Sequence, residues 1–383
     1  MKIPSDLAHT IVDSKAYAEG DPVDDAFRTI RAEMPLAVAE PEGVEPFWVV
    51  SRHADIMAVE KQPEIFHNGD KSTFMTLKES DGMVRFITGG EPNLIRSLVS
   101  VDGQEHKDLR AVVFPSVTPK AIRGLEDDIR AIAKSFVAEM LAKAPECDFA
   151  AEIAFLYPLK VVLDLIGVPE PDHAKMLELT QWLFTYADPD LKRPGSDLTD
   201  PQEITRTWGI VFEEFEKYYQ PMIADRQQCP RHDLASVIAN GKIDGGPMEH
   251  RALISYFIIA STAGHDTTAA TTGHGMWQLA QRPDILADLK ANPDLIPGFV
   301  EETIRWASPV QQFVRSATQD YEIKGRTIRK GDLVYLSYLS ANRDEEAFPD
   351  PFTFDHRRSP NRHVGFGFGG HTCLGIHLAR MEM

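Results

Sequence analysis

The chain has 383 residues, 43% of them hydrophobic, which is enough for a large packed core. Its 40 Lys and Arg residues stand against 58 Asp and Glu residues, so the formal net charge is −18 at pH 7. General binding to nucleic acid or to an anionic membrane requires clustered positive charge, and this balance argues against both.

The first half of the chain predicts one short strand followed by helices. A strand-like segment at 47–50 follows Pro46, and a helix-like segment at 54–61 comes next. Residues 68–105 show no steady periodicity, and an irregular stretch of this length inside a compact protein is uncommon unless it binds something. From Val117 onward the pattern is helical, through 125–142, 150–166 and 203–226.

Residues 249–281 form the longest predicted helix. This segment contains no proline and is apolar around most of its circumference, as expected for a helix buried in the middle of a large protein. A helix near 297–307 follows, and then short strands at 313–317, 321–323, 327–328 and 333–337. The predicted fold class is mainly α with a small β portion, and we expect a single domain over 1–383 because no linker divides the chain.

The cysteines and the amino terminus bear on the compartment. Cys147, Cys229 and Cys373 share no CxxC spacing and are typical of reduced thiols in a cytosolic protein. Residues 1–6 lack a positively charged start followed by an apolar run, and no stretch is apolar over the roughly eighteen residues of a membrane span. We expect a cytoplasmic protein.

The most specific motif is a glycine-rich loop around one cysteine, Phe366-Gly367-Phe368-Gly369-Gly370-His371-Thr372-Cys373-Leu374-Gly375. Four glycines in ten residues disfavour a regular helix or strand and suit a tight loop whose amides turn toward one atom. A buried thiolate needs such donors, and the predicted helix from Leu374 to Arg380 places Cys373 near its positive end. The alternatives are a buried structural cysteine and a zinc site with His371, which lacks a second ligand pair.

This loop resembles the heme-ligand loop of the cytochrome P450 monooxygenases, whose iron takes an axial cysteine thiolate. The resemblance runs from about Asp21 to the last residue. It implies the cytochrome P450 fold with the long helix over the heme, heme b (iron protoporphyrin IX) as cofactor, and Cys373 as the metal ligand. Residues 263–268, 340–346 and 360–375 are most similar to bacterial enzymes that hydroxylate monoterpenes such as terpineol.

Two further motifs lie on predicted helices. Glu302 and Arg305 are three residues apart, close enough for a charge-assisted pair, and the composition alone would make them a solvated surface pair. The resemblance instead implies a buried structural Glu-x-x-Arg that Arg358 joins. His106 and Arg110 are four residues apart, and composition alone favours a solvated charged face for them too. The resemblance instead implies that both bind the heme propionates, together with Arg315 and His371.

Polar residues interrupt the long apolar helix at Gly264-His265-Asp266-Thr267. Such residues are poor in a helix interior, and the interpretation from composition is evenly divided between a satisfied polar kink and a functional site. The resemblance implies an acid–alcohol pair of catalytic residues, with Thr267 holding dioxygen and its water and Asp266 relaying protons. His265 departs from the small or apolar residue common there, and we expect it to face a neighbouring helix rather than serve as a proton relay.

The substrate pocket follows from helical geometry and the resemblance. Ile259, Ala263 and Thr267 share one helix face with Thr262 beside them, and Gln311 and Phe313 precede Arg315. Phe74, Met75, Met83 and Phe86 are candidates from the irregular stretch. The lining is apolar with a few polar groups, so a small hydrophobic substrate is predicted.

The electrons must come from outside, since the chain shows no flavin, nicotinamide or iron–sulfur fingerprint. The resemblance implies a ferredoxin with its NAD(P)H-dependent reductase, docking over Cys373 near Arg110 and Arg362. The sequence ends at Met383 inside the helix that follows Cys373, whereas family members complete that helix and add a small sheet. Either the sequence is cut short or part of the substrate site is lacking.

Three alternative functions remain open at this point. A peroxide-using heme-thiolate enzyme is disfavoured by Asp266 and Thr267, because such enzymes typically lack that pair. A non-catalytic heme sensor or carrier would show a heme spectrum without substrate-linked electron uptake. A helical protein without a cofactor would be colourless and free of iron.

Overall fold

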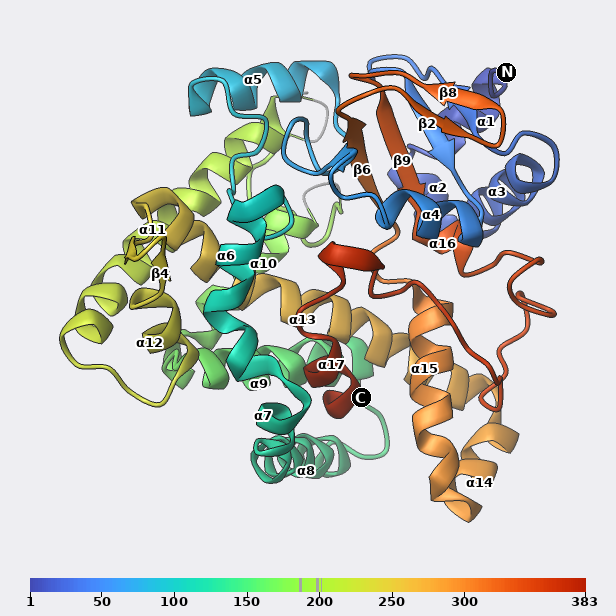
Figure 1. Ribbon diagram of the computed structural model, residues 1–383. Coiled ribbons are helices and arrows are strands. Elements are labelled where there is room, and N and C mark those ends of the chain that lie inside the picture. The colour runs from blue at the N-terminus through green and yellow to red at the C-terminus, as the bar shows by residue number, and fades with distance from the viewer. Residues whose placement is uncertain (186–187, 198–199, 201) are drawn as a thin grey trace.

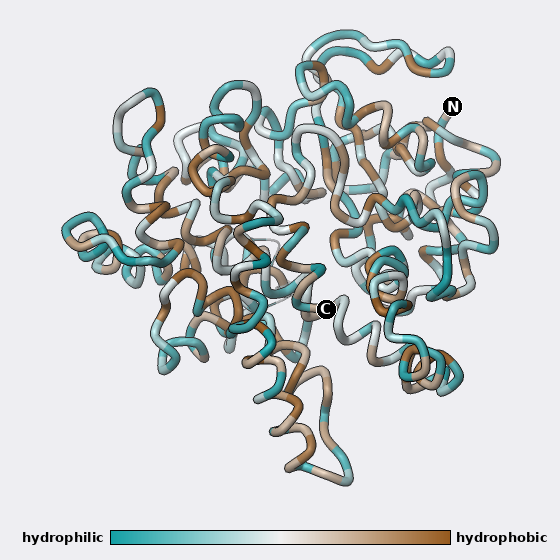
Figure 2. Tube along the Cα trace, turned by 60° about the horizontal axis from the view of Figure 1, so that its bottom comes forward, coloured by the Kyte–Doolittle hydropathy of each residue, from teal (hydrophilic) through white to brown (hydrophobic). Residues whose placement is uncertain are grey.

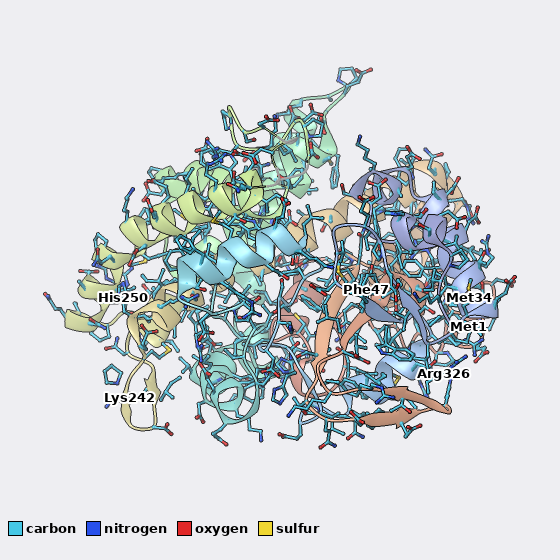
Figure 3. All side chains as sticks on the ribbon, turned by 90° about the horizontal axis from the view of Figure 1, so that it is seen from above. Met1, Met34, Phe47, Lys242, His250 and Arg326 are labelled. Carbon is cyan, nitrogen blue, oxygen red and sulfur yellow. The ribbon has the colours of Figure 1, made fainter. Side chains whose placement is uncertain are left out.

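The computed structural model describes residues 1–185, 188–197, 200 and 202–383. A region of helices and a smaller region built around a sheet lie side by side (Figure 1). The long helix α13 (His250–Gln281) crosses the middle of the molecule between them. Figure 3 shows His250, where α13 begins, on the opposite side from Met1 and Arg326 of the sheet region.

The sheet region has a five-stranded sheet in the order β1-β2-β9-β6-β3. β2 and β9 are parallel, with Phe47 opposite Leu333, and the other neighbours are antiparallel. Aromatic side chains of Phe27, Phe47 and Tyr335 fill the core between this sheet and the N-terminal helices. The elements are α1 (Ser5–Thr10), α2 (Ser14–Glu19), α3 (Asp21–Glu33), β1 (Ala37–Ala39), β2 (Phe47–Val50), α4 (His53–Glu60), β3 (Phe66–His67), β6 (Gln312–Ala317), β7 (Tyr321–Ile323), β8 (Arg326–Ile328), β9 (Leu333–Ser337) and α16 (Tyr338–Ala341).

The helical region packs around α13. Phe215, Tyr219 and Phe257 join α11 to α13 in its core, and α9 makes the most extensive helix contact with α13. The elements are α5 (Lys78–Thr88), α6 (Gly103–Val113), α7 (Pro119–Arg123), α8 (Glu126–Ala142), a π-turn (Ala150–Ala154), α9 (Leu156–Ile166), α10 (His173–Phe184), α11 (Glu203–Gln228), α12 (Leu234–Ala239), β4 (Lys242–Ile243), β5 (Gly246–Pro247), α14 (Pro283–Ala291), α15 (Ile296–Ala307) and α17 (Ile376–Glu382).

The expected elements and the observed ones agree where the apolar period is strong. The strands at 47–50, 321–323 and 333–337 have the predicted bounds, and α13 begins one residue after the predicted start. The prediction of an irregular stretch at 68–105 was wrong in part, because α5 forms at Lys78–Thr88. Gly82 and four charged residues of α5 are equally common in loops, so the composition hid the helix although its apolar residues recur at helical spacing.

Apolar residues gather on the inner helices and strands, whereas the outlying loops are mostly hydrophilic (Figure 2). No helix in the described part of the chain is long and apolar enough to cross a membrane.

Candidate active site

The cysteine loop is held by its own backbone. The amide of Cys373 donates to the carbonyl of Phe366 at 2.9 Å, and Gly367 and Gly369 adopt φ values of 67° and 72°. A β-carbon on Gly369 would collide with the carbonyl of Glu60 at the end of α4, so only glycine fits this close approach. The loop is therefore fixed against the sheet region before α17 begins.

Cys373 has accessible surface although protein atoms surround it. Desolvation raises the pKa of its thiol, while the Gly375 amide and the guanidinium groups of Arg110 and Arg380 act to lower it. The predicted helix start at Leu374 was wrong by two residues, since α17 begins at Ile376. The groups that favour a thiolate are therefore two cations and the amide of Gly375, which is the N-cap residue of α17.

In the middle of α13, one strip is accessible beside positions that are buried. Ala263 and Ala270 are exposed, and Ile259, Asp266 and Thr267 are partly exposed, whereas the turns before the strip are almost fully buried. These positions recur at three- and four-residue spacing, so they share one face. The strip lies in the interior, because α13 crosses the middle of the fold and α17 packs on it (Figure 1).

Asp266 and Thr267 lie in the middle of this strip. Thr267 Oγ1 donates to the carbonyl of Ala263 at 3.0 Å, which leaves the hydroxyl oxygen free to accept. Desolvation raises the pKa of Asp266, and its carboxyl has no hydrogen-bond partner among the described residues. A carboxyl of this kind holds its proton more tightly than a solvated one, as a proton relay requires.

His265 points to the other side of α13. Its Nε2 lies 2.8 Å from the carbonyl of Phe155, between the π-turn and α9, and the side chain is fully buried. Desolvation lowers the pKa of His265 to about 4, so the imidazole is neutral and Nε2 carries the proton it donates. His265 thus faces a neighbouring helix, as the sequence predicted.

The four residues predicted to hold propionates lie around the cysteine loop. The rings of His106 and His371 have centroids 3.9 Å apart, and Asn68 Nδ2 lies 2.7 Å from His371 Nε2. Arg110 has no ion pair within the described residues, although desolvation lowers its pKa and Cys373 opposes that shift. Arg315 is buried and donates to Glu60 Oε1 at 3.1 Å.

The sequence reasoning missed the groups behind these side chains. Asp102 accepts from the amides of Asn68 and Gly69 at 2.7–2.9 Å and lies 3.6 Å from His371. Asp102 is the N-cap residue of α6, but its side chain makes no capping hydrogen bond, so the local sequence did not indicate these partners. Glu60, which binds Arg315, lies 255 residues away in the sequence, and no local pattern marks it.

Glu302, Arg305 and Arg358 form one buried cluster. Arg305 makes a bidentate pair with Glu302 at 2.7 and 2.8 Å, and Arg358 Nε lies 3.1 Å from the same carboxylate. Arg305 also donates to the carbonyls of Asn342 and Pro351, so it ties α15 to the segment after α16. Glu302 and Arg305 have no accessible surface, so the pair supports the fold rather than a binding site.

Two predicted pocket residues are corrected by the structure. Thr262 is fully buried and its hydroxyl donates to the carbonyl of Ile258, so it presents no surface to a ligand. Phe86 lies on α5 with 84% of its surface exposed, because it falls on the outer face of a helix that the sequence reasoning did not predict. Phe313 packs between Phe74 and Tyr338, and Gln311 is exposed at the start of β6.

The comparisons with known proteins agree with this site. The family model described as Cytochrome P450 matches residues 71–298 and 294–383. The protein named Cytochrome P450-terp of Pseudomonas sp is 40% identical over 381 residues, which cover 100% of this chain and 89% of that protein. Linalool 8-monooxygenase of Pseudomonas putida is 31% identical, over 94% of this chain and 86% of that protein.

A solved structure extends the likeness to the fold. The crystal structure of CYP108D1 from Novosphingobium aromaticivorans is 40% identical and has a TM-score of 0.90, covering 100% of this chain and 89% of that chain. The chain belongs to the cytochrome P450 family. Its cofactor is heme b, bound in this family through a cysteine thiolate.

The residues present fit such a cofactor. Arg110 is a partly buried cation without an acidic partner in the described part of the chain, which is the arrangement that an incoming carboxylate completes. Ala263 leaves accessible surface where a larger side chain would fill the interior. The thiol of Cys373 also has accessible surface, and the positive charge of Arg110 acts to lower its pKa.

Proposed function

We propose that this monooxygenase binds its heme iron through Cys373 and inserts one atom of dioxygen into a C–H bond of a small hydrophobic substrate. The observation that carries the proposal is the placement of Cys373. It precedes α17, which packs on α13, and the accessible positions in the middle of α13 include Ala263, Asp266 and Thr267. The heme, when bound, supplies the redox chemistry of oxygen activation.

The chain's own residues bind, orient and move protons. His106, Arg110, Arg315 and His371 would bind the two propionates, because cations and neutral imidazoles donate to carboxylates. Thr267 would hold water through its free acceptor positions, and Asp266 would supply protons from a carboxyl whose pKa desolvation raises. Glu302, Arg305 and Arg358 have structural roles.

We propose a monoterpenoid or an aromatic hydrocarbon as substrate. Ile259, Ala263 and Phe313 offer an apolar surface with few polar groups, which suits a small hydrophobic molecule. The relatives named Cytochrome P450-terp and Linalool 8-monooxygenase support a terpenoid in particular. A spin-state titration against terpenes, aromatic hydrocarbons, fatty acids and steroids tests this, and a response to steroids alone would contradict it.

The electrons would come from a ferredoxin reduced by an NAD(P)H-dependent reductase. Arg362 is exposed in the segment leading to the cysteine loop, and Arg110 lies on the side of Cys373, so both offer positive charge to an acidic partner. Arg362→Glu should slow the first electron transfer from ferredoxin most strongly at low salt. Arg329→Glu, at the exposed end of the β7–β8 hairpin, is the control.

The ligand assignment is tested by the carbon monoxide adduct of the reduced protein. It should absorb at the position diagnostic of thiolate ligation, and Cys373→Ser should abolish that absorption. Cys229→Ser, at an exposed position just after α11, should leave it unchanged. An unaltered spectrum in Cys373→Ser would refute Cys373 as the ligand.

A further inference from the structure

Glu60 is a buried acid in contact with the propionate-binding candidate Arg315. It ends α4 and is 6% exposed. Its Oε1 accepts from Arg315 Nη2 at 3.1 Å and from the Tyr338 hydroxyl at 2.6 Å. Arg315 also donates to the carbonyl of Val314 at 3.1 Å, so the guanidinium is held from two sides.

The second oxygen of this carboxyl is unusual. Glu60 Oε2 is buried and has no hydrogen-bond partner among the described residues. A small pocket of about 10 Å³ adjoins it, lined by Glu60, Pro63, Phe66, Arg315, Phe368 and His371. A volume of this size admits about one water molecule, which would link the bare oxygen to the edge of the heme site.

We propose that Glu60 is a positioning residue of the heme site, which holds the Arg315 guanidinium at its edge and whose protonation state sets the reduction potential of the heme iron. The inference rests on the proposed function, in which Arg315 binds a propionate. Glu60 touches neither the substrate nor Cys373, so its effect reaches the iron through Arg315 and through its own charge.

The sign of the effect follows from electrostatics. An ionised Glu60 stabilises the more positive ferric state, and a proton on Glu60 removes that preference, so protonation raises the potential. Reduction of the iron therefore raises the proton affinity of Glu60, which takes up at most one proton from solvent in the pH range where it titrates. Desolvation raises the pKa of Glu60, whereas Arg315, Tyr338 and the Phe368 amide lower it.

Other charged or titratable groups surround this carboxyl. Arg315 approaches from β6 and Tyr338 from α16, while His371 of the cysteine loop lines the same pocket. Lys61, the next residue along the chain, lies over the ring of Phe368. A pH dependence due to His371 or Lys61 would survive the removal of the Glu60 carboxyl.

The experiment measures the ferric–ferrous midpoint potential of the heme-loaded protein as a function of pH. In the wild type the potential should rise as the pH falls through the titration of Glu60. Glu60→Gln keeps the shape and the acceptor oxygen, so its potential should start from the acid limit of the wild type and lack the fall that the ionisation of Glu60 causes. Tyr338→Phe keeps the acid but loses the hydrogen bond that lowers its pKa, so the same curve should move to higher pH.

Glu64→Gln is the matched control, because Glu64 is an exposed acid one turn after Glu60 and its side chain makes no contact with Arg315. A Glu60→Gln curve that follows the wild type overturns the proposal. If Glu60→Gln does not retain heme, Tyr338→Phe decides: a shifted curve supports the role of Glu60 and a superimposable one refutes it. The carbon monoxide spectrum of each variant separates this outcome from a failure of thiolate ligation.

Discussion

Gly264 of α13 faces Val162 of α9 so closely that a β-carbon on the glycine would lie 2.9 Å from Val162 Cγ2. The backbone of α13 therefore packs directly on the side chain of Val162. The same turn of α13 carries Ala263, Asp266 and Thr267 on the accessible strip. The distance of that strip from α9 is thus set by a contact on another face of the helix.

Adding one methyl group at this contact should be costly. We expect Gly264→Ala to lower the free energy of unfolding by about 1–3 kcal/mol, because overpacking forces α13 away from α9. Urea unfolding of the apoprotein measures it. Gly273→Ala is the matched control on the same helix, because a β-carbon there meets nothing within 4 Å. The higher helix propensity of alanine should raise the free energy of unfolding of this variant by about 1 kcal/mol.

A double variant tests the cause. Val162→Ala removes the methyl groups that the new β-carbon would meet, so Val162→Ala/Gly264→Ala should be destabilised less than the sum of the two single changes. Strict additivity would show that the contact does not limit the approach of the helices.

The Glu302–Arg305 pair should be essential to the fold. Arg305→Ala removes the bidentate partner of Glu302, whose carboxylate has no accessible surface. We expect the free energy of unfolding to fall by about 3–5 kcal/mol. Arg357→Ala removes a side chain that is 55% exposed, from its pair with Asp288, and should change little. Equal urea midpoints for the two variants would contradict a structural role for Arg305.

His265 predicts a pH dependence of stability. Its pKa is about 4 in the folded protein against an ordinary value of 6.5, because burial disfavours the cation. The unfolded chain therefore binds the proton more tightly, so the contribution is present above pH 6.5 and is lost as the pH falls to about 4. The difference amounts to roughly 3 kcal/mol.

His265→Gln isolates this contribution, since glutamine can still donate to the carbonyl of Phe155 but does not titrate. The apoprotein of this variant should lose less stability than the wild type between pH 6.5 and 4. His9→Gln, at an exposed position, is the control. Parallel pH profiles of wild type and His265→Gln would refute a buried neutral imidazole.

Thr267 should couple electron use to product formation. Thr267→Ala removes the hydroxyl from the accessible strip, and the variant should consume electrons while releasing peroxide in place of hydroxylated product. Thr267→Ser should retain most of the coupling, because the hydroxyl that donates to Ala263 is kept. The ratio of product to electrons consumed is the measurement.

Thr271 offers a control one turn further along α13. Its hydroxyl donates to the carbonyl of Thr267 at 2.7 Å, but the side chain is buried away from the strip. Thr271→Ala should keep the wild-type ratio. Uncoupling in Thr271→Ala equal to that in Thr267→Ala would point to bending of the helix rather than to the Thr267 hydroxyl.

Local patterns in the sequence determined the long elements and the cysteine loop. The largely apolar circumference of 249–281 predicted α13 almost to the residue, and the glycines around Cys373 predicted a tight loop, in which Gly367 and Gly369 have positive φ angles. The polar helix α5 escaped prediction, because its charged residues and Gly82 are equally common in loops.

Only the tertiary structure decided which side chains meet. Whether Thr262 or Ala263 reaches the interior strip depends on the rotation of α13 against α9, which the Gly264 contact sets. The partners of His371 and Arg315 are Asp102 and Glu60, brought in from segments more than 250 residues away in the chain. The period of apolar residues predicts the helix or strand in which a residue lies, whereas contacts between distant residues form only when separate elements pack together.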